Sequence, residues 1–323
     1  MTIEQIYNLA IEMGIDADLR GKKSVENNLK RLKDKYLKLS KEEKEEFDEE
    51  KLKNPYSDTR ILFGDKNKKV KKAMVGIGAD AGELMVAKYL SDKNKPIDLY
   101  ISHHPVGKAL AALDEVMHLQ AEVLANYGVP INVAESLLKP RISEVERSIS
   151  PENHNKAVMA AQNLNLPLMC VHTPADNLVA SYLDNVIKKE KPEFVEDLIK
   201  ILKNIPEYAA AGKNNAGVKI FAGSKENHCG KIALTEITGG TEGSSKIYEK
   251  LAIAGIGTIV GMHMSEEHKK EAEAAHVNVV IAGHISSDSL GMNLFLDELE
   301  KRGIEIISAC GLIRVSRVKG LKK

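Results

Sequence analysis

Residues 99–105 read Leu-Tyr-Ile-Ser-His-His-Pro. The first three are typical of a buried strand, Ser102 ends it, and Pro105 prevents the chain from continuing in a sheet. Two adjacent histidines, His103 and His104, therefore follow a core strand at its carboxyl end, where open α/β sheets bind ligands. Adjacent strand residues point to opposite faces, so both imidazoles can serve one site only where the strand breaks. Two neighbouring metal ions would suit that geometry.

A strand, a helix and a second strand form the surroundings of this histidine pair. Residues 72–77 predict a strand, residues 78–82 a glycine-containing turn, residues 83–90 a helix, and residues 97–102 the strand that precedes the histidines. Such a βαβ unit favours a right-handed crossover and a parallel sheet.

A similar pattern returns later in the chain. Residues 231–235 predict a strand, 238–243 a glycine turn, 244–254 a helix, and 258–261 a strand that runs into Met262-His263. The interval from Met74 to His103 is one residue shorter than that from Ala233 to His263. We therefore expect an α/β fold with two related lobes and mostly parallel sheets. The alternative is that any two βαβ units resemble each other.

The composition is that of a soluble globular protein. Of 323 residues, 43% are hydrophobic and 28% are charged, which is enough to build two lobes with real cores. Lys and Arg together number 46, as do Asp and Glu, so the formal net charge is zero. This balance gives no reason to expect a nucleic-acid partner.

The sequence also predicts the compartment. No apolar run is long enough for a membrane span, and the amphipathic start Met-Thr-Ile-Glu-Gln is not typical of a signal peptide. The three cysteines, Cys170, Cys229 and Cys310, form no CxxC pair. A sparse and odd number of cysteines indicates reduced thiols, and we expect a cytoplasmic protein.

The chain divides into three predicted parts. Residues 1–69 are expected to form helices that pack on the first lobe, residues 70–190 the first lobe, and residues 191–323 the second, with the site between the lobes. Thr2 and Gln5 form a capping box for the first helix, which Gly14 is expected to end. The sequence Ser150-Pro151-Glu152 predicts another helix start.

Three strand ends carry side chains of the kind that bind metal ions. They are His103 with His104, His172 with Asp176, and His284 with Asp288. In a parallel sheet such strand ends fall on one edge. Imidazoles combined with carboxylates suit a pair of divalent ions such as Zn, Mn, Fe, Ni or Co. A bridging carboxylate would hold two ions about 3.5–4 Å apart.

These motifs resemble the Nif-three-like family of dinuclear metal-centre proteins, which is also known as GTP cyclohydrolase type two. The family signature combines Ser-His-His-Pro, His-Thr-x-x-Asp and a C-terminal Gly-His-x-x-x-acid motif. The matching residues here are 102–105, 172–176 and 283–288. The resemblance extends from about residue 70 to the C-terminus, and the N-terminal helices match it loosely.

The resemblance implies a ligand set and an assembly. The implied metal ligands are His103, His104, Asp176, His284 and Asp288, and His172 would contact the ligands or the substrate. The resemblance also implies a closed homo-oligomer, commonly a hexamer, whose sites face an interior cavity.

The chain departs from the family pattern in three respects. The last ligand of the family is usually Glu, and Asp288 is one methylene shorter. About thirty additional residues lie around positions 131–155, and residues 177–231 are too few to hold the extra domain of longer members. If Asp288 is no ligand, Ser286-Ser287 would start a helix with Asp288 in its first turn, where the helix dipole favours a carboxylate.

Two functions remain open at this stage. The first is a metal-dependent hydrolase that acts on a nucleotide-like or phosphorylated small molecule, with metal-bound water as the nucleophile. The second is a non-catalytic metal-binding scaffold, carrier or regulatory protein. Asp80 follows the first core strand and could approach the site, as could Glu242 at the corresponding turn of the second lobe.

Overall fold

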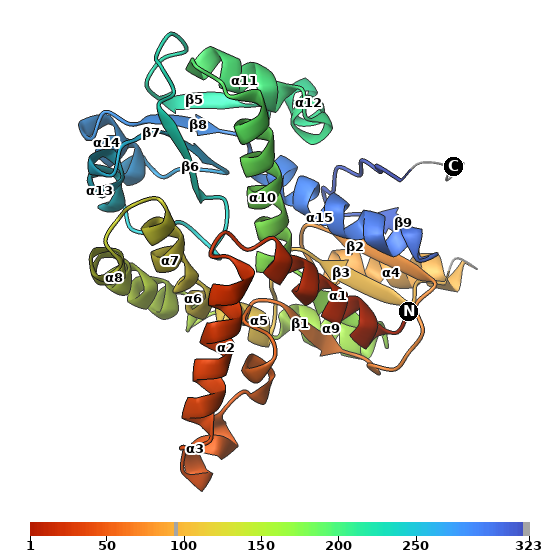
Figure 1. The fold of residues 1–323 in the computed structure, drawn as a ribbon. Helices are drawn as coiled ribbons and strands as arrows, with labels where there is room; N and C mark the ends of the chain where they lie inside the picture. Colours follow the sequence, from red (N-terminus) through yellow and green to blue (C-terminus); the bar gives the residue numbers. More distant parts are fainter. Residues whose placement is uncertain (94–95, 319–323) are drawn as a thin grey trace.

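Two mostly parallel sheets organise the protein. The computed structural model describes residues 1–93 and 96–318 (Figure 1). The first sheet has the order β1-β4-β3-β2-β9 and the second β5-β8-β7-β6; β1 and β5 are antiparallel edge strands. The first sheet contains β1 (Arg60–Phe63), β2 (Lys72–Gly76), β3 (Leu99–Ser102), β4 (Leu168–Cys170) and β9 (Glu305–Ser308); the second contains β5 (Lys219–Ala222), β6 (Lys231–Glu236), β7 (Ile256–Gly261) and β8 (Asn278–Ile281).

The strand order repeats between the sheets. Strands β1-β4-β3-β2 of the first sheet have the same spatial order and relative directions as strands β5-β8-β7-β6 of the second. In both sheets the strand next to the antiparallel edge leads into a long helix: β4 into α10 (Thr173–Glu190) and β8 into α15 (His284–Lys301). The α/β class and the two related lobes are therefore confirmed.

Helices cover both faces of the first sheet. One face packs against α1 (Ile3–Asp16) and α15, and the shared core contains Ile6, Val75 and Phe295. The other face packs against α4 (Ala81–Asp92) and α9 (Lys156–Asn163) through Leu84 and Ala161. Every residue of β3 is buried, as expected for a parallel strand covered on both faces.

The long helices α10 and α15 pack against each other, and α10 runs between the two sheets (Figure 1). A Cβ on Gly291 of α15 would lie 2.3 Å from the carbonyl oxygen of Ala175, so only glycine permits this crossing. Gly14 does not end α1, contrary to the prediction. A Cβ there would lie 2.7 Å from the Cβ of Pro174, so Gly14 instead lets α1 cross the start of α10.

The second sheet is covered by a different set of helices. One core joins it to α7 (Leu119–Asn126), α8 (Ile131–Ile149), α13 (Ile247–Ile253) and α14 (Glu266–Ala274), and another joins it to α10, α11 (Val195–Lys203) and α12 (Pro206–Lys213). The predicted helix start at residue 150 is wrong. The apolar face of α8 continues to Ile149, and Ser150 is its C-cap.

The division into residues 1–69, 70–190 and 191–323 stays a prediction, and three elements do not follow it. Strand β1 belongs to the first sheet, to which β9 returns from the end of the chain. Helix α8, which lies in the additional segment 131–155, packs in the core of the second sheet. The two lobes are therefore interleaved along the sequence.

The N-terminal helices beyond α1 project from the body (Figure 1). The segment α2 (Lys22–Tyr36) buries only Val25, and α3 (Lys41–Glu46) and η1 (Glu49–Leu52) bury no residue. Two short helices, α5 (Lys108–Ala111) and α6 (Leu113–Val116), follow the histidine pair. Within the described ranges, no helix combines the length and the apolar character needed to span a membrane.

Candidate metal centre

The histidine pair lies directly after β3. The backbone N–H of His103 donates to Gly76 and that of His104 to Ile77, so both residues still follow the neighbouring strand. The His103 Nδ1–H donates to the carbonyl of Val171 at 3.0 Å, which leaves Nε2 facing the site. His103 is buried, whereas 37% of the His104 side chain is exposed. The site is thus open on the His104 side.

The other predicted residues come from the starts of α10 and α15. His172 precedes the first residue of α10 and Asp176 follows one turn later; His284 begins α15 and Asp288 follows one turn later. Residues four apart share a helix face, so both pairs point in one direction. Since α15 begins at His284, Asp288 lies in its second turn. The alternative in which Asp288 sits in the first turn of a helix that starts at residue 286 is therefore wrong.

Asp288 is the centre of the cluster. Its Oδ1 lies 3.5 Å from His103 Nε2, and its Oδ2 lies 3.2 Å from His104 Nε2 and 3.6 Å from His284 Nε2. The two oxygens therefore face different histidines. Asp176 extends the cluster, because its Oδ1 lies 3.4 Å from His103 Nε2. The short side chain of Asp288 reaches these imidazoles because the start of α15 carries it inward.

Three carboxylate oxygens of this cluster have no hydrogen-bond partner among the residues that the structure describes. They are Asp176 Oδ1 and both oxygens of Asp288, all buried from solvent. A buried anionic group without a partner is costly, and proteins normally pair such groups or use them to bind metal ions. These carboxylate oxygens are therefore suited to bind cations.

Burial and the two aspartates shift the pKa values of the three histidines in different directions. Burial lowers the pKa of His103, but Asp288 and Asp176 raise that pKa by more, so it lies well above its usual value. Burial lowers the pKa of His104 and of His284, and both stay below the usual value. Burial raises the pKa of Asp288, but the neighbouring histidines, His103 first, lower it far below its usual range. His104 and His284, neutral beside the ionised Asp288, are in the protonation state that metal binding requires, whereas His103 would give up the proton that the two carboxylates stabilise when it binds an ion.

The spacing of the ligand atoms also fits. Two ligands that are each about 2.0–2.2 Å from one ion lie roughly 3.0–3.5 Å apart in tetrahedral or octahedral geometry. The observed distances between nitrogen and oxygen atoms are close to this range. In the described ranges, three groups of residues bring their ligand atoms within 4.8 Å of one another: His104, His284 and Asp288; His103, Asp176 and Asp288; and His103, His104 and His172. Buried His and Asp residues here could hold metal ions.

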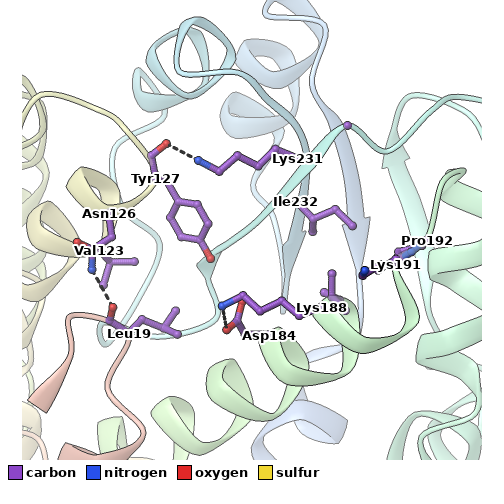
Figure 2. Close-up of a pocket in the computed structure, with 12 residues that line it drawn as sticks. Leu19, Val123, Asn126, Tyr127, Asp184, Lys188, Lys191, Pro192, Lys231 and Ile232 are labelled. Carbon is purple, nitrogen blue, oxygen red and sulfur yellow. Dashed lines mark hydrogen bonds and ion pairs between the residues drawn. The ribbon is translucent and has the colours of Figure 1, made fainter.

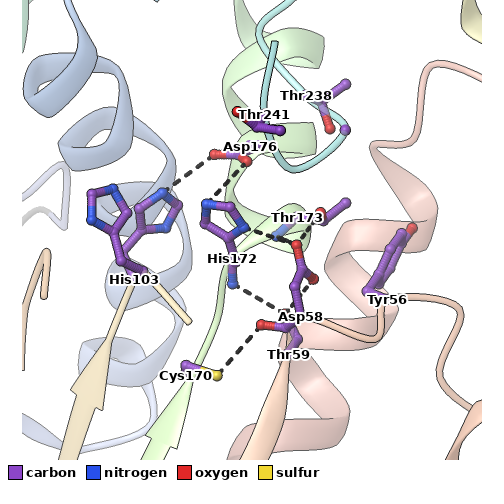
Figure 3. Close-up of polar contacts among 12 residues, drawn as sticks. Tyr56, Asp58, Thr59, His103, Cys170, His172, Thr173, Asp176, Thr238 and Thr241 are labelled. Atoms are coloured by element: carbon purple, nitrogen blue, oxygen red, sulfur yellow. Dashed lines mark hydrogen bonds and ion pairs between the residues drawn. The ribbon is translucent and has the colours of Figure 1, made fainter. Parts of the chain in front are cut away.

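The sequence did not predict the partner of His172. The His172 Nδ1 lies 2.8 Å from Oδ2 of Asp58, a fully buried carboxylate from the loop before β1 (Figure 3). The hydroxyl of Thr173 donates to the same oxygen at 2.6 Å. Asp58 belongs to no metal motif and lies far from His172 in sequence, so only the fold reveals the contact.

The second lobe forms the opposite wall of the site. A small cavity of about 40 Å³ lies beside the cluster, which leaves room for ions and water. Glu242 lines it, as the sequence suggested, and accepts hydrogen bonds from His263 Nδ1 at 3.1 Å and from the backbone N–H of Ser265 at 2.8 Å. The lining residues are His172, Asp176, Glu236, Ile237, Thr238, Gly240, Thr241, Glu242, Met262, His263, His284 and Asp288.

Asp80 lies apart from these groups. It is the N-cap of α4, and its carboxylate accepts the backbone N–H of Gly82 at 2.7 Å. It is absent from the cavity lining and from the three metal-type groups found in the described part of the chain. Its position is explained by the capping of α4.

A larger cavity of about 560 Å³ lies elsewhere, between α7, α10 and β6 (Figure 2). Two of the lysines at its rim already have partners. The Lys188 Nζ pairs with Asp184 at 2.6 Å, and the Lys231 Nζ donates to the carbonyl of Tyr127 at 3.1 Å. These groups are paired and none belongs to the histidine cluster.

Comparison with solved structures identifies the fold. A NIF3 superfamily protein from Sphaerobacter thermophilus is 24% identical and has a TM-score of 0.69, over 79% of this chain and 92% of that chain. The chain has the NIF3 fold. Reduced HcgD from Methanocaldococcus jannaschii is 17% identical with a TM-score of 0.50, over 84% of this chain and 97% of that chain. No protein-family model matches the sequence. No curated protein matches it either.

The NIF3 fold explains why distant sequence motifs meet. Its two lobes repeat the same strand order, and α10 and α15 hold equivalent places after β4 and β8. The start of each helix supplies one histidine and one aspartate, His172 being the N-cap of α10 and His284 the first residue of α15. The histidine pair after β3 has His263, after β7, as its counterpart in the second lobe. The NIF3 fold thus assembles the cluster from three strand ends.

Proposed function

We propose that this protein binds two divalent transition-metal ions and uses them to hydrolyse a nucleotide-like or phosphorylated small molecule. One observation carries the proposal: two of the metal-type groups share Asp288, whose two oxygens face different histidines. A carboxylate in this position can bridge two ions. His104 and His284 would hold one ion, and His103 and Asp176 the other. Bound divalent ions supply water of lowered pKa and polarise the substrate.

The second lobe supplies groups that could orient the substrate. Glu236, Glu242, Thr238 and Thr241 line the cavity and offer acceptors for N–H and O–H groups. Among the described residues, the lining includes neither lysine nor arginine, so phosphate oxygens would be bound through the ions. A nucleotide whose base or ribose donates hydrogen bonds to these acceptors would suit this lining. The hydrolytic ring opening of GTP is one example of the proposed reaction.

Turnover by metal-loaded protein tests the proposal. GTP, GMP, a phosphomonoester and an uncharged nucleoside should be compared with and without bound metal, and the products separated by chromatography. We expect metal-dependent hydrolysis of at least one phosphorylated substrate. Asp176→Asn should lower kcat/KM at least 100-fold, because it removes an ion-facing carboxylate. Asp184→Asn, a change on the exposed side of the same helix, should leave kcat/KM unchanged. Equal turnover by metal-free protein would contradict the proposal.

A non-catalytic role is the second candidate, and the small volume of the cavity favours it. A metal carrier or regulatory scaffold needs space for ions but none for a substrate. Retention of metal without turnover of any substrate in the panel would support this role.

We also propose a closed homo-oligomer, such as a hexamer. Three large apolar side chains of α4, Met85, Val86 and Tyr89, are at least half exposed. A neighbouring subunit that covered them would remove this apolar surface from water. Light scattering would measure the mass in solution.

A further inference from the structure

The carboxylate of Asp58 holds His172 in one orientation. Asp58 is fully buried. Its Oδ2 accepts hydrogen bonds from the hydroxyl and the backbone N–H of Thr173 and from His172 Nδ1. The hydroxyl of Thr59 accepts the backbone N–H of His172 at 3.0 Å. An ionised carboxylate can only accept hydrogen bonds, so Nδ1 of His172 carries the hydrogen. Nε2 is then the ring nitrogen that points away from Asp58.

The free nitrogen of His172 faces the metal-type cluster. Its Nε2 lies 3.9 Å from Asp176 Oδ2, and the His172 and His103 rings are 4.8 Å apart between centroids (Figure 3). Ring nitrogens of His103, His104 and His172 lie within 4.8 Å of one another. In the described part of the chain, no residue forms a hydrogen bond with this Nε2. A buried imidazole nitrogen directed at two other imidazoles and a carboxylate has the surroundings of a metal ligand.

The loop that carries Asp58 is itself fixed. The side-chain amide of Asn54 donates to the carbonyl of Thr59 at 2.9 Å, and its oxygen accepts the N–H of Tyr56 at 2.8 Å. The buried guanidinium of Arg60 donates to the carbonyls of Tyr56 and Thr59, both at 2.8 Å. The loop that carries Asp58 is therefore held by backbone and side-chain contacts that do not involve the cluster.

We propose that His172 is a further metal ligand and that Asp58 is its positioning residue. The Nε2 atom of His172 would bind the same ion as His103 and Asp176. Metal-bound histidines commonly donate their second ring N–H to a carboxylate, which fixes the ring and increases its basicity. The N-terminal segment thereby contributes to the centre through Asp58. This inference rests on the proposed function, because it requires that the cluster binds metal.

Zinc affinity tests the role of both residues. Wild type, Asp58→Asn and His172→Gln should be titrated against a chelating dye, with folding checked by circular dichroism. Asp58→Asn should weaken zinc binding at one position about 10–100-fold, the usual cost of losing such a partner. His172→Gln should weaken the same position by at least as much and leave the other unchanged. Asp297→Asn, which alters a buried carboxylate at the far part of α15, is the matched control and should retain wild-type affinity.

The outcomes separate the two proposals. Wild type that binds no zinc would contradict the metal centre itself. Wild type that binds zinc, with folded His172→Gln of unchanged affinity, would overturn only the role of His172. If neither variant folds, the crystal structure of zinc-loaded wild type decides: Nε2 about 2.1 Å from zinc supports the inference, and a distance beyond roughly 3 Å overturns it.

Discussion

Asp288→Ala is expected to abolish metal binding at both positions of the centre. Asp288 is the one residue shared by the two groups that would hold the ions, and its oxygens lie 3.2–3.6 Å from three imidazoles. Loss of an outer partner alone costs about 10–100-fold in affinity, so loss of a shared ligand should cost more. Elemental analysis after dialysis and titration with zinc would measure the effect.

Two further variants serve as controls for Asp288→Ala. Asp288→Glu keeps a carboxylate and should retain metal, because it restores the residue that the resemblance leads us to expect. Glu298→Ala changes a partly exposed carboxylate of the same helix, which pairs with Lys301 and Arg302, and should leave metal content unchanged. Wild-type zinc affinity at both positions in Asp288→Ala would show that this carboxylate is no ligand.

Arg317→Ala is expected to destabilise the protein by about 3–5 kcal/mol, because it leaves a buried charge without its partner. Glu207 of α12 is fully buried and receives two hydrogen bonds from the Arg317 guanidinium, at 2.7 and 2.8 Å. Its only other side-chain partner in the described residues is Asn293 of α15. Urea unfolding would measure the loss of stability.

Controls identify the cause of that loss. Arg302→Ala breaks an ion pair at the surface and should cost less than about 1 kcal/mol. Glu207→Gln combined with Arg317→Ala should recover part of the loss, since the buried group is then neutral. A cost for Arg317→Ala as small as that for Arg302→Ala would mean that Glu207 is not stabilised by this pair.

The local patterns predicted the core of the fold well. Buried apolar runs, turn glycines and βαβ spacing predicted β2, β3, β6 and β7, and the repeated interval predicted two related lobes. Histidines and aspartates at strand ends predicted the residues that meet at the site. These features depend on short stretches of sequence, in which the periodicity of the strand or helix is visible.

Long-range packing was not visible in the sequence. Gly14 was interpreted as a helix end, because the contact that requires glycine there is with Pro174, far along the chain. Strand β9 pairs with β2 from the opposite end of the sequence. Asp58 is likewise far from its partner His172 along the chain. Nothing in its local sequence distinguishes it from a surface aspartate.

Anomalous diffraction from a crystal of the zinc-loaded protein tests the central claim, that the cluster is a two-ion centre. We predict two peaks per chain, about 3.5–4 Å apart. One should lie beside His104 and His284 and the other beside His103 and Asp176, with Asp288 between them. A single peak, or no peak within reach of Asp288, would contradict the claim.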